Sequence, residues 1–319
     1  NEEFKKQFSF TNWTLTSCYS KCTQGGALAL WIEFENRIGT LILKDCLFEN
    51  NNAENSDKKG GNGGGFASGL SSLSGMQLII DGCNFTNNYA VKSGGALSLQ
   101  SSGPIEVTNC SFINNQATEG GGAIYIHPNN DGKGLLDKCL ISGCNFENNK
   151  DSSNNGHTIF FEENEAASTI LTIEENCIFK NNENFDNYPF EGYVIVSMAP
   201  TLEFIDSRID FSDDHGSAPA LKLAGSSTSI LNNVYFLKTD SYLQTGYDAN
   251  AIFIDSTTTK AEINFCTFDR CGVYGAKSAI VDKGKETIID NCKFLNDEPS
   301  YGCKTGAVYV KSHHRARLK

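Results

Sequence analysis

One repeated phrase constrains this chain more than any other feature of its sequence. A cysteine, an aromatic residue two positions later and a pair of asparagines recur with small variations. The copies are DCLFENN ending at Asn51, GCNFTNN at Asn88, NCSFINN at Asn115, GCNFENN at Asn149, NCIFKNN at Asn182 and NCKFLND at Asp297. Self-similarity at a fixed period is typical of architectures built from stacked repeats.

A second phrase follows the first after a stretch of variable length. It reads GGALAL from Gly25, GGALSL from Gly94 and GGAIYI from Gly121, with weaker copies toward the C-terminus. With the aromatic residue of the first phrase as a marker, Leu15 fills the first of ten slots, Phe48 the second and Phe211 the seventh. From Leu15 to Phe294 is 279 residues over nine steps, or 31 per repeat. The small residue of the second phrase also gives ten markers, so both motifs predict ten turns.

Alternating apolar residues predict short strands within each repeat. One strand follows the small residue of the second phrase, a second precedes the cysteine, and the cysteine and aromatic residue form a third. Before the cysteine the chain is expected to turn a corner, because that position holds residues that tolerate a left-handed backbone. These are Asp45, Gly82, Asn109, Gly143, Asn176 and Asn291.

The asparagine and glycine pairs each have two interpretations. Exposed asparagines suit glycan contacts, but the preferred interpretation is that they form turns and that their amides bond to the backbone of neighbouring turns. Paired glycines suit a phosphate cradle, but no Lys-Ser/Thr follows them and no helix begins there. They indicate close backbone approach at a stacked corner instead.

Three short strands in a repeat of about 31 residues, with no helical periodicity between them, predict an all-β fold, the parallel β-helix, a solenoid of about ten turns. Residues 1–319 are expected to form one continuous domain. A doubly wound α/β fold needs amphipathic helices between its strands, and none is visible. The core is expected to consist of columns of like residues.

The segment CSFINNQATEGGGAIYI, Cys110 to Ile126, resembles the repeat of the chlamydial polymorphic outer membrane proteins, which pair an FxxN phrase with a GGA[ILV] phrase. The resemblance extends over essentially the whole chain, but it decays after Tyr193. It implies a right-handed, pectin-lyase-like β-helix that is displayed at the cell surface or outside the cell and used for adhesion. No membrane-barrel segment follows the repeats, unlike in the autotransporters of that family. The chain is therefore expected to be a fragment of a longer helix or to be delivered by another route.

Composition excludes several classes of partner. The 26 basic and 38 acidic residues give a net charge of −12, so no basic field attracts nucleic acid. No run approaches eighteen apolar residues, so no transmembrane segment is expected. The initial NEEFKK lacks the apolar core of a signal peptide, so any export signal is expected to have been removed or to lie outside this sequence.

The stretch from Asp206 to Gly216 is the most acidic candidate site. Glycan hydrolysis needs two carboxylates, which a β-helix draws from adjacent turns, but these carboxylates lie in one turn, so no catalytic residue is assigned. Weak candidates for calcium ligands are Asp206, Asp210, Asp213 and Asp214, although no D-x-D-x-D-G loop is present. A solvated acidic loop is the preferred interpretation. His157 stands where other repeats have a second glycine, and no cofactor is expected.

The cysteines follow the repeat. Seven occupy the slot two residues before the core aromatic: Cys46, Cys83, Cys110, Cys144, Cys177, Cys266 and Cys292. Trp13, Ile209 and Val234 are assigned to the same slot, which indicates a need for an apolar side chain. Cys139 shares its slot with Leu41 and is expected to be an eighth free core thiol. The four remaining cysteines lie near the chain ends, where staples stabilise most, so Cys18–Cys22 and Cys271–Cys303 disulfides are predicted.

Three N-x-S/T sequons, at Asn12, Asn84 and Asn109, are expected to be exposed and are candidates for glycosylation.

Taken together, the sequence favours a non-catalytic extracellular solenoid that contacts a protein or glycan at a cell surface through its loops. The longest loops are 51–64 and the one between Ala123 and Cys139. One alternative is a polysaccharide-acting enzyme of the pectin-lyase-like class. Another is an architectural subunit of an extracellular or ciliary filament that stacks on neighbouring copies.

Overall fold

The computed structural model describes most of the repeat strands and leaves several connections undescribed. The described residues are 6–20, 25–32, 39–54, 61–70, 76–101, 103–128, 138–153, 156–162, 169–182, 193–211, 219–225, 228–239, 249, 251–271, 278–295, 307–310 and 315–318. They contain strands and no helix.

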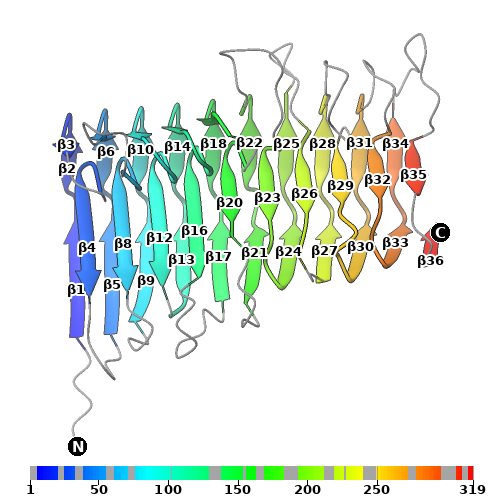
Figure 1. Cartoon of the computed structure of the whole chain (residues 1–319), viewed down its shortest axis with the longest axis horizontal. Coiled ribbons are helices and arrows are strands. Elements are labelled where there is room, and N and C mark those ends of the chain that lie inside the picture. The colour runs from blue at the N-terminus through cyan, green and yellow to red at the C-terminus, as the bar shows by residue number, and fades with distance from the viewer. Residues whose placement is uncertain are drawn as a thin grey trace, which may run out of the picture.

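The strands form a parallel β-helix in which successive turns lie side by side along a rod, with the two chain ends at opposite ends of the rod (Figure 1). We name the sheets A to D and number each turn from its sheet A strand. Sheet A contains β1 (Lys6–Thr11), β5 (Gly39–Lys44), β9 (Met76–Asp81), β13 (Ile105–Thr108), β17 (Lys138–Ser142), β21 (Ile170–Glu174), β24 (Thr201–Ile205), β27 (Thr228–Asn232), β30 (Lys260–Asn264), β33 (Glu286–Asp290) and β36 (Arg315–Leu318).

Among the described residues, sheets B and D have one strand in each of turns one to ten, which confirms the predicted solenoid of about ten turns, and β36 begins an eleventh turn in sheet A. Sheet B contains β2 (Thr14–Thr16), β6 (Leu47–Glu49), β10 (Asn84–Thr86), β14 (Ser111–Ile113), β18 (Asn145–Glu147), β22 (Ile178–Lys180), β25 (Arg208–Asp210), β28 (Tyr235–Leu237), β31 (Thr267–Asp269) and β34 (Lys293–Leu295). Sheet D contains β4 (Leu28–Ile32), β8 (Phe66–Leu70), β12 (Leu97–Ser101), β16 (Ile124–Pro128), β20 (Ile159–Phe161), β23 (Ile195–Ser197), β26 (Leu221–Leu223), β29 (Ile252–Ile254), β32 (Ile280–Asp282) and β35 (Val308–Val310).

The first five turns differ from the prediction of three strands per turn, because each carries a fourth, two-residue strand. These strands form sheet C: β3 (Tyr19–Ser20), β7 (Asn52–Ala53), β11 (Tyr89–Ala90), β15 (Gln116–Ala117) and β19 (Lys150–Asp151). The buried alanines Ala53, Ala90 and Ala117 explain why the extra strand fits against the core. The pattern is only two residues long, so alternation could not reveal it.

Phenylalanines of sheet B stack through the core as expected. In turns two to six the rings of Phe48, Phe85, Phe112, Phe146 and Phe179 are nearly parallel, with centroids 4.6–5.1 Å apart. Offset stacking of this kind adds to the free energy gained by burying each ring. Phe236, Phe268 and Phe294 resume the column at 4.9 Å spacing.

The register of turn seven corrects the assignment of two residues. Ile209 pairs with Phe179 and Phe236, so it belongs to the phenylalanine column and not to the cysteine slot. Phe211 is buried but lies beyond the end of β25. Ser207 is therefore the residue in the cysteine slot. In that turn Phe204, from sheet A, packs against Phe179 with the two rings nearly perpendicular and their centroids 6.1 Å apart.

The second asparagine of each pair is buried and forms a ladder along the rod, which confirms the structural interpretation of the pairs. Asn115 is representative: its Oδ1 accepts hydrogen bonds from the backbone and side-chain nitrogens of Asn88, both at 3.0 Å. Its Nδ2 donates to the carbonyl oxygen of Phe85 at 2.9 Å and to Oδ1 of Asn149 at 3.0 Å. The first asparagine of each pair instead has a left-handed backbone, as in Asn114 with φ 55°.

The glycine pairs also play the predicted structural role. Gly121 has φ 61°, which favours glycine, and a Cβ on Gly122 would lie 2.2 Å from the backbone oxygen of His157 in the next turn. His157 itself is buried, and its backbone nitrogen donates to Tyr193 O at 2.8 Å. Burial lowers the pKa of His157 to about 4, so it is a neutral core side chain.

Candidate binding groove

The corner between sheets A and B carries a ladder of left-handed residues on the outside of the rod. Each corner residue predicted from the sequence has positive φ: Asp45 (52°), Gly82 (65°), Asn109 (53°), Gly143 (61°), Asn176 (61°) and Asn291 (53°). Asp206 and Asn233 fill the same position in turns seven and eight, with φ 46° and 54°. The backbone thus takes a left-handed residue in each of these turns, and the residue is Asp, Asn or Gly; turn nine places Phe265 there with φ 55°.

Side chains of this ladder reach from one turn to the next. The Asn109 amide donates to Oδ1 of Asp81 at 3.0 Å, and the Thr108 hydroxyl donates to the same oxygen at 2.9 Å. These two hydrogen bonds lower the pKa of the Asp81 carboxyl. Asn233 bonds instead to the corner residue of the preceding turn, donating to Oδ1 of Asp206 at 2.7 Å.

Turn six has one residue more than its neighbours at this corner. Ser142 pairs with Glu174 in sheet A, and Asn145 pairs with Ile178 in sheet B. Between these two pairs the chain advances three residues in turn five and four residues in turn six. Two consecutive residues, Glu175 and Asn176, have positive φ at 58° and 61°. An inserted residue of this kind bends the chain and redirects side chains.

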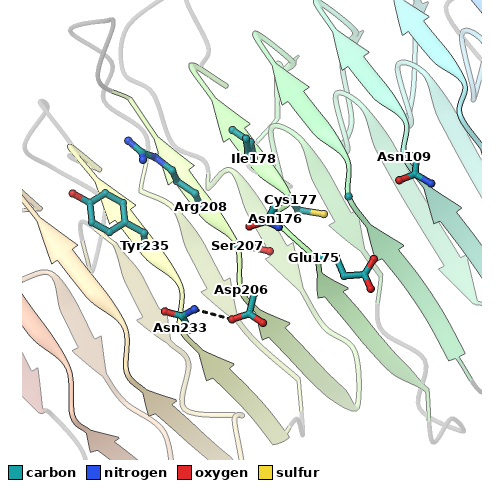
Figure 2. Close-up of a pocket in the computed structure, with 11 residues that line it drawn as sticks. Asn109, Glu175, Asn176, Cys177, Ile178, Asp206, Ser207, Arg208, Asn233 and Tyr235 are labelled. Atoms are coloured by element: carbon teal, nitrogen blue, oxygen red, sulfur yellow. Dashed lines mark hydrogen bonds between the residues drawn. The ribbon is translucent and has the colours of Figure 1, made fainter.

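A groove of about 810 Å³ lies along this corner across turns four to eight. It is lined by Asn109, Gly143, Glu175, Asn176, Cys177, Ile178, Asp206, Ser207, Arg208, Asn233 and Tyr235. Figure 2 shows these side chains arranged in steps from one turn to the next, with Asn233 and Asp206 joined by their hydrogen bond. The opening is therefore extended along the rod axis and does not lie within one turn.

The side chains in the groove differ in how firmly they are held. Oε2 of Glu175 accepts a hydrogen bond from the Ser142 hydroxyl at 2.5 Å. The side-chain amide of Asn176, which is exposed, makes no hydrogen bond to another residue that the structure describes. Asn176 is therefore the groove side chain with both its donor and its acceptor groups available.

Arg208 and Tyr235 form the far wall. Nη2 of Arg208 lies 2.6 Å from Oδ2 of Asp210, and the guanidinium carbon lies 4.9 Å from the centre of the Tyr235 ring. The Tyr235 hydroxyl donates to Oδ2 of Asp269 at 2.8 Å. Burial raises the pKa of Tyr235, with a smaller contribution from the Asp269 hydrogen bond. These contacts hold the guanidinium group of Arg208 and the ring of Tyr235 in position.

The structure separates the acidic residues that the sequence grouped together. Asp206 lies in the groove, where it accepts the Asn233 bond, whereas Asp210 is buried at the end of β25 beside Arg208. Asp213 and Asp214 lie outside the described residues. Within the described part of the chain, no group of three or more His, Cys, Asp or Glu side chains could hold a metal ion.

The three sequon asparagines are exposed, as expected. They differ in backbone conformation and hydrogen bonding: Asn12 and Asn109 occupy left-handed corners, and the Asn109 amide is bonded to Asp81, whereas Asn84 lies in β10. Glycosylation at these positions stays a prediction.

The cysteine slot has a polar function in addition to its apolar one. The backbone nitrogens of Cys46 and Cys83 donate to the sulfur of the next cysteine in the column, each at 3.4 Å, and the Cys110 thiol donates to Thr108 O at 3.1 Å. Ser207 reproduces the thiol bond, since its hydroxyl donates to Ile205 O at 2.8 Å. The slot was predicted to hold a buried apolar side chain. That prediction was wrong for Trp13, whose side chain is 46% exposed, but it holds for Val234, which is buried.

Free thiols were predicted along this ladder. All seven ladder cysteines and Cys139 are free, and burial raises the pKa of Cys139 to about 12. Cys18 is also a free thiol in this structure, and its predicted partner Cys22 lies outside the described residues, as does Cys303, the predicted partner of Cys271. Both pairings therefore stay predictions.

A second cluster of titratable side chains lies on the outer face of sheet D. Glu162 Oε2 contacts both the Tyr125 hydroxyl and Nδ1 of His127. The hydrogen bond from His127 lowers the pKa of the Glu162 carboxyl, and burial raises the pKa of Tyr125. One predicted contact loop follows β16 directly after this cluster, but residues 129–137 of that loop and residues 55–60 of the other lie outside the described residues.

Sequence reasoning missed the groove, although a signal was present. Leu43 and Cys46 are three residues apart, as are Ile141 and Cys144, but Ile173 and Cys177 are four apart. That extra residue is the insertion at Glu175. That Asn109 and Tyr235 line the same groove can be recognised only when the stacking of turns four to eight is known.

Comparison with known proteins gives one match. Residues 109–127 match the model of the Chlamydia polymorphic membrane protein repeat. No curated protein and no solved structure matches the chain significantly. No helix among the described residues is long and apolar enough to cross a membrane. The match covers part of turn four, from the corner at Asn109 through β14, β15 and most of β16, and together with the sheet topology it identifies a parallel β-helix that carries a polymorphic membrane protein repeat.

Proposed function

We propose that the protein is a non-catalytic interaction module at the cell surface, and that it acts in adhesion by contacting a protein or glycan through the groove across turns four to eight. The observation that carries this proposal is the set of exposed polar side chains that line the groove. The repeat matched at residues 109–127 belongs to a family of surface-associated proteins, which supports the location.

The fold does not require these polar side chains. Gly82 and Gly143 occupy the same corner position in other turns with the same left-handed backbone. Asn176, Asp206 and Asn233 therefore present functional groups that the backbone can do without. Exposed polar residues on a rigid scaffold are the usual means by which such scaffolds contact partners.

The second candidate function is a glycan hydrolase, which one observation favours. Glu175 and Asp206 are carboxylates from adjacent turns that line the same groove, and paired carboxylates carry out acid/base hydrolysis. Both are exposed to solvent, whereas a general acid needs an environment that favours its protonated form. This geometry favours binding over catalysis.

Binding of the fluorescently labelled chain to cultured epithelial cells, measured by flow cytometry, tests the proposal. The variant carrying Asn176→Gly and Asn233→Gly removes two groove side chains and keeps the left-handed backbone. We expect it to lose at least tenfold in cell binding, whereas the matched variant Asp45→Gly with Asn291→Gly, outside the groove, binds normally. Equal binding by both variants would exclude the groove as the contact.

The hydrolase candidate has its own test. The chain is incubated with polygalacturonate, xylan and glucomannan, and the release of reducing ends is measured. We expect no release above that of a heat-denatured sample. Activity that survives purification and disappears in Glu175→Gln and in Asp206→Asn would replace the binding function with the enzymatic one.

A further inference from the structure

Resting on the proposed function, we infer that the groove binds an uncharged, linear oligosaccharide that lies along the rod axis, with about one sugar residue per turn. Four features of the groove point to this ligand: the spacing of the corner side chains, their hydrogen-bonding groups, the charge of the groove and the pairing of both edges of its strands.

The spacing comes from the sheet itself. Each turn from four to eight contributes one corner residue, except turn six, which contributes both Glu175 and Asn176; the strands on either side of the corner pair in register in sheet A and in sheet B. Neighbouring parallel strands lie about 4.8 Å apart. The repeat length of an extended β-linked hexose chain is close to this strand spacing, so successive sugars meet equivalent positions on successive turns.

The available groups match sugar hydroxyls. Asn176 offers an amide donor and an acceptor, and Asn109 and Asn233 keep their Oδ1 acceptors after donating Nδ2 to Asp81 and Asp206. A sugar hydroxyl both donates and accepts hydrogen bonds, so it suits side-chain amides. Ile178, which is 40% exposed, and the half-buried Tyr235 supply apolar surface for the C–H faces of the rings.

Charge disfavours an acidic glycan. Glu175 and Asp206 place two carboxylates in the groove, and the chain has a net charge of −12. Arg208 is the lining cation, but Asp210 lies 2.6 Å from its guanidinium group. A uronic acid chain would therefore meet two carboxylates and an arginine that is already paired.

A peptide strand has no edge to join. β22 pairs with both β18 and β25, and β25 pairs with β28, so the backbone groups of these strands are used within sheet B. Addition of a strand from a partner needs an exposed sheet edge. The groove thus offers side chains for recognition and no backbone ladder.

Isothermal titration of the purified chain with soluble hexasaccharides tests this inference. The probes are cellohexaose, mannohexaose, xylohexaose and chitohexaose as uncharged chains, and hexagalacturonate as the acidic chain. We expect at least one uncharged hexasaccharide to bind, and the corresponding disaccharide to bind at least tenfold more weakly because it spans fewer turns.

The variants identify the site. Asn176→Gly with Asn233→Gly is expected to weaken binding of the hexasaccharide at least tenfold, and Asp45→Gly with Asn291→Gly to leave it unchanged. The inference is overturned if no uncharged hexasaccharide binds, if hexagalacturonate binds as tightly, or if the groove variant binds normally. Cell binding that depends on the groove, without binding of any hexasaccharide, would leave the proposed function standing and exclude a linear uncharged glycan as its ligand.

Discussion

Replacing Asn115 by alanine tests whether the buried asparagine ladder stabilises the rod. The substitution removes four side-chain hydrogen bonds, two accepted from Asn88 and two donated to Phe85 O and Asn149 Oδ1. Each is worth roughly 1 kcal/mol net, so the loss is expected to be about 4 kcal/mol. Asn115 is fully buried, so water does not replace the lost partners.

Urea unfolding followed by far-UV circular dichroism measures this loss. With a urea dependence of roughly 3 kcal/mol/M, the midpoint is expected to fall by about 1 M or somewhat more. Asn114→Gly is the matched control, because Asn114 is exposed with φ 55° and glycine keeps that backbone. Its midpoint is expected to change little.

A third variant, Asn115→Asp, separates hydrogen bonding from shape. The carboxylate keeps the acceptor oxygens but places an oxygen opposite Phe85 O and Asn149 Oδ1, so it is expected to destabilise more at pH 7 than at pH 3. If Asn115→Ala unfolds at the same urea concentration as Asn114→Gly, the ladder does not stabilise the fold and the reasoning is refuted.

Three further predictions follow from the core. Gly122→Ala is expected to lower the free energy of unfolding by more than about 2 kcal/mol, because its Cβ would lie 2.2 Å from a backbone oxygen, whereas Gly65→Ala, in a slot that holds alanine in other turns, should cost little in the same urea assay. His157, with its pKa lowered from 6.5 to about 4, binds fewer protons when folded, so its contribution is complete above pH 6.5 and falls by up to roughly 3 kcal/mol as the pH drops toward 4. Between pH 7 and pH 4 the urea midpoint of His157→Gln is expected to fall less than that of the unsubstituted protein. An equal fall in the two proteins would contradict the burial of His157. Alkylation after unfolding without reductant is expected to modify eight cysteines by mass spectrometry; modification of all twelve would remove the predicted Cys18–Cys22 and Cys271–Cys303 bridges, and modification of four or fewer would mean that the ladder is cross-linked.

Much of the fold could be predicted because the backbone demands particular residues at particular places. The corner at Asp45 needs a left-handed residue, and the close approach at Gly122 leaves no room for a side chain. The corner requirement recurs along the rod, and the glycine requirement recurs in turns one to four, so both become visible as repeats. The bonding of the Asn115 amide to the backbone of a neighbouring turn followed from the same regularity, whereas its burial and its bonds to the Asn88 and Asn149 side chains did not.

The register of turn seven and the groove were beyond this reasoning. The aromatic side chain of Phe211 predicts a place in the phenylalanine column of sheet B. The left-handed corner at Asp206 instead sets the register of turn seven and places Ile209 in that column. The groove depends on outward side chains, which the core does not constrain and which vary from turn to turn. Only stacking brings Asn109 within the same groove as Tyr235.

The interruption of the phenylalanine column has a mechanical consequence. Hydrogen bonds between turns run along the rod, so tension between the two ends loads the turns in series, and the weakest junction sets the rupture force. Through turn six, stacked rings and bonded asparagines resist separation together, up to Phe179 and Asn182. At turn seven Ile209 replaces a ring, and the column resumes at Phe236. Under load the rod is therefore expected to separate first between turns six and seven, within the length of the groove. The rupture force is then expected to depend on whether the groove holds a ligand that contacts both sides of that junction.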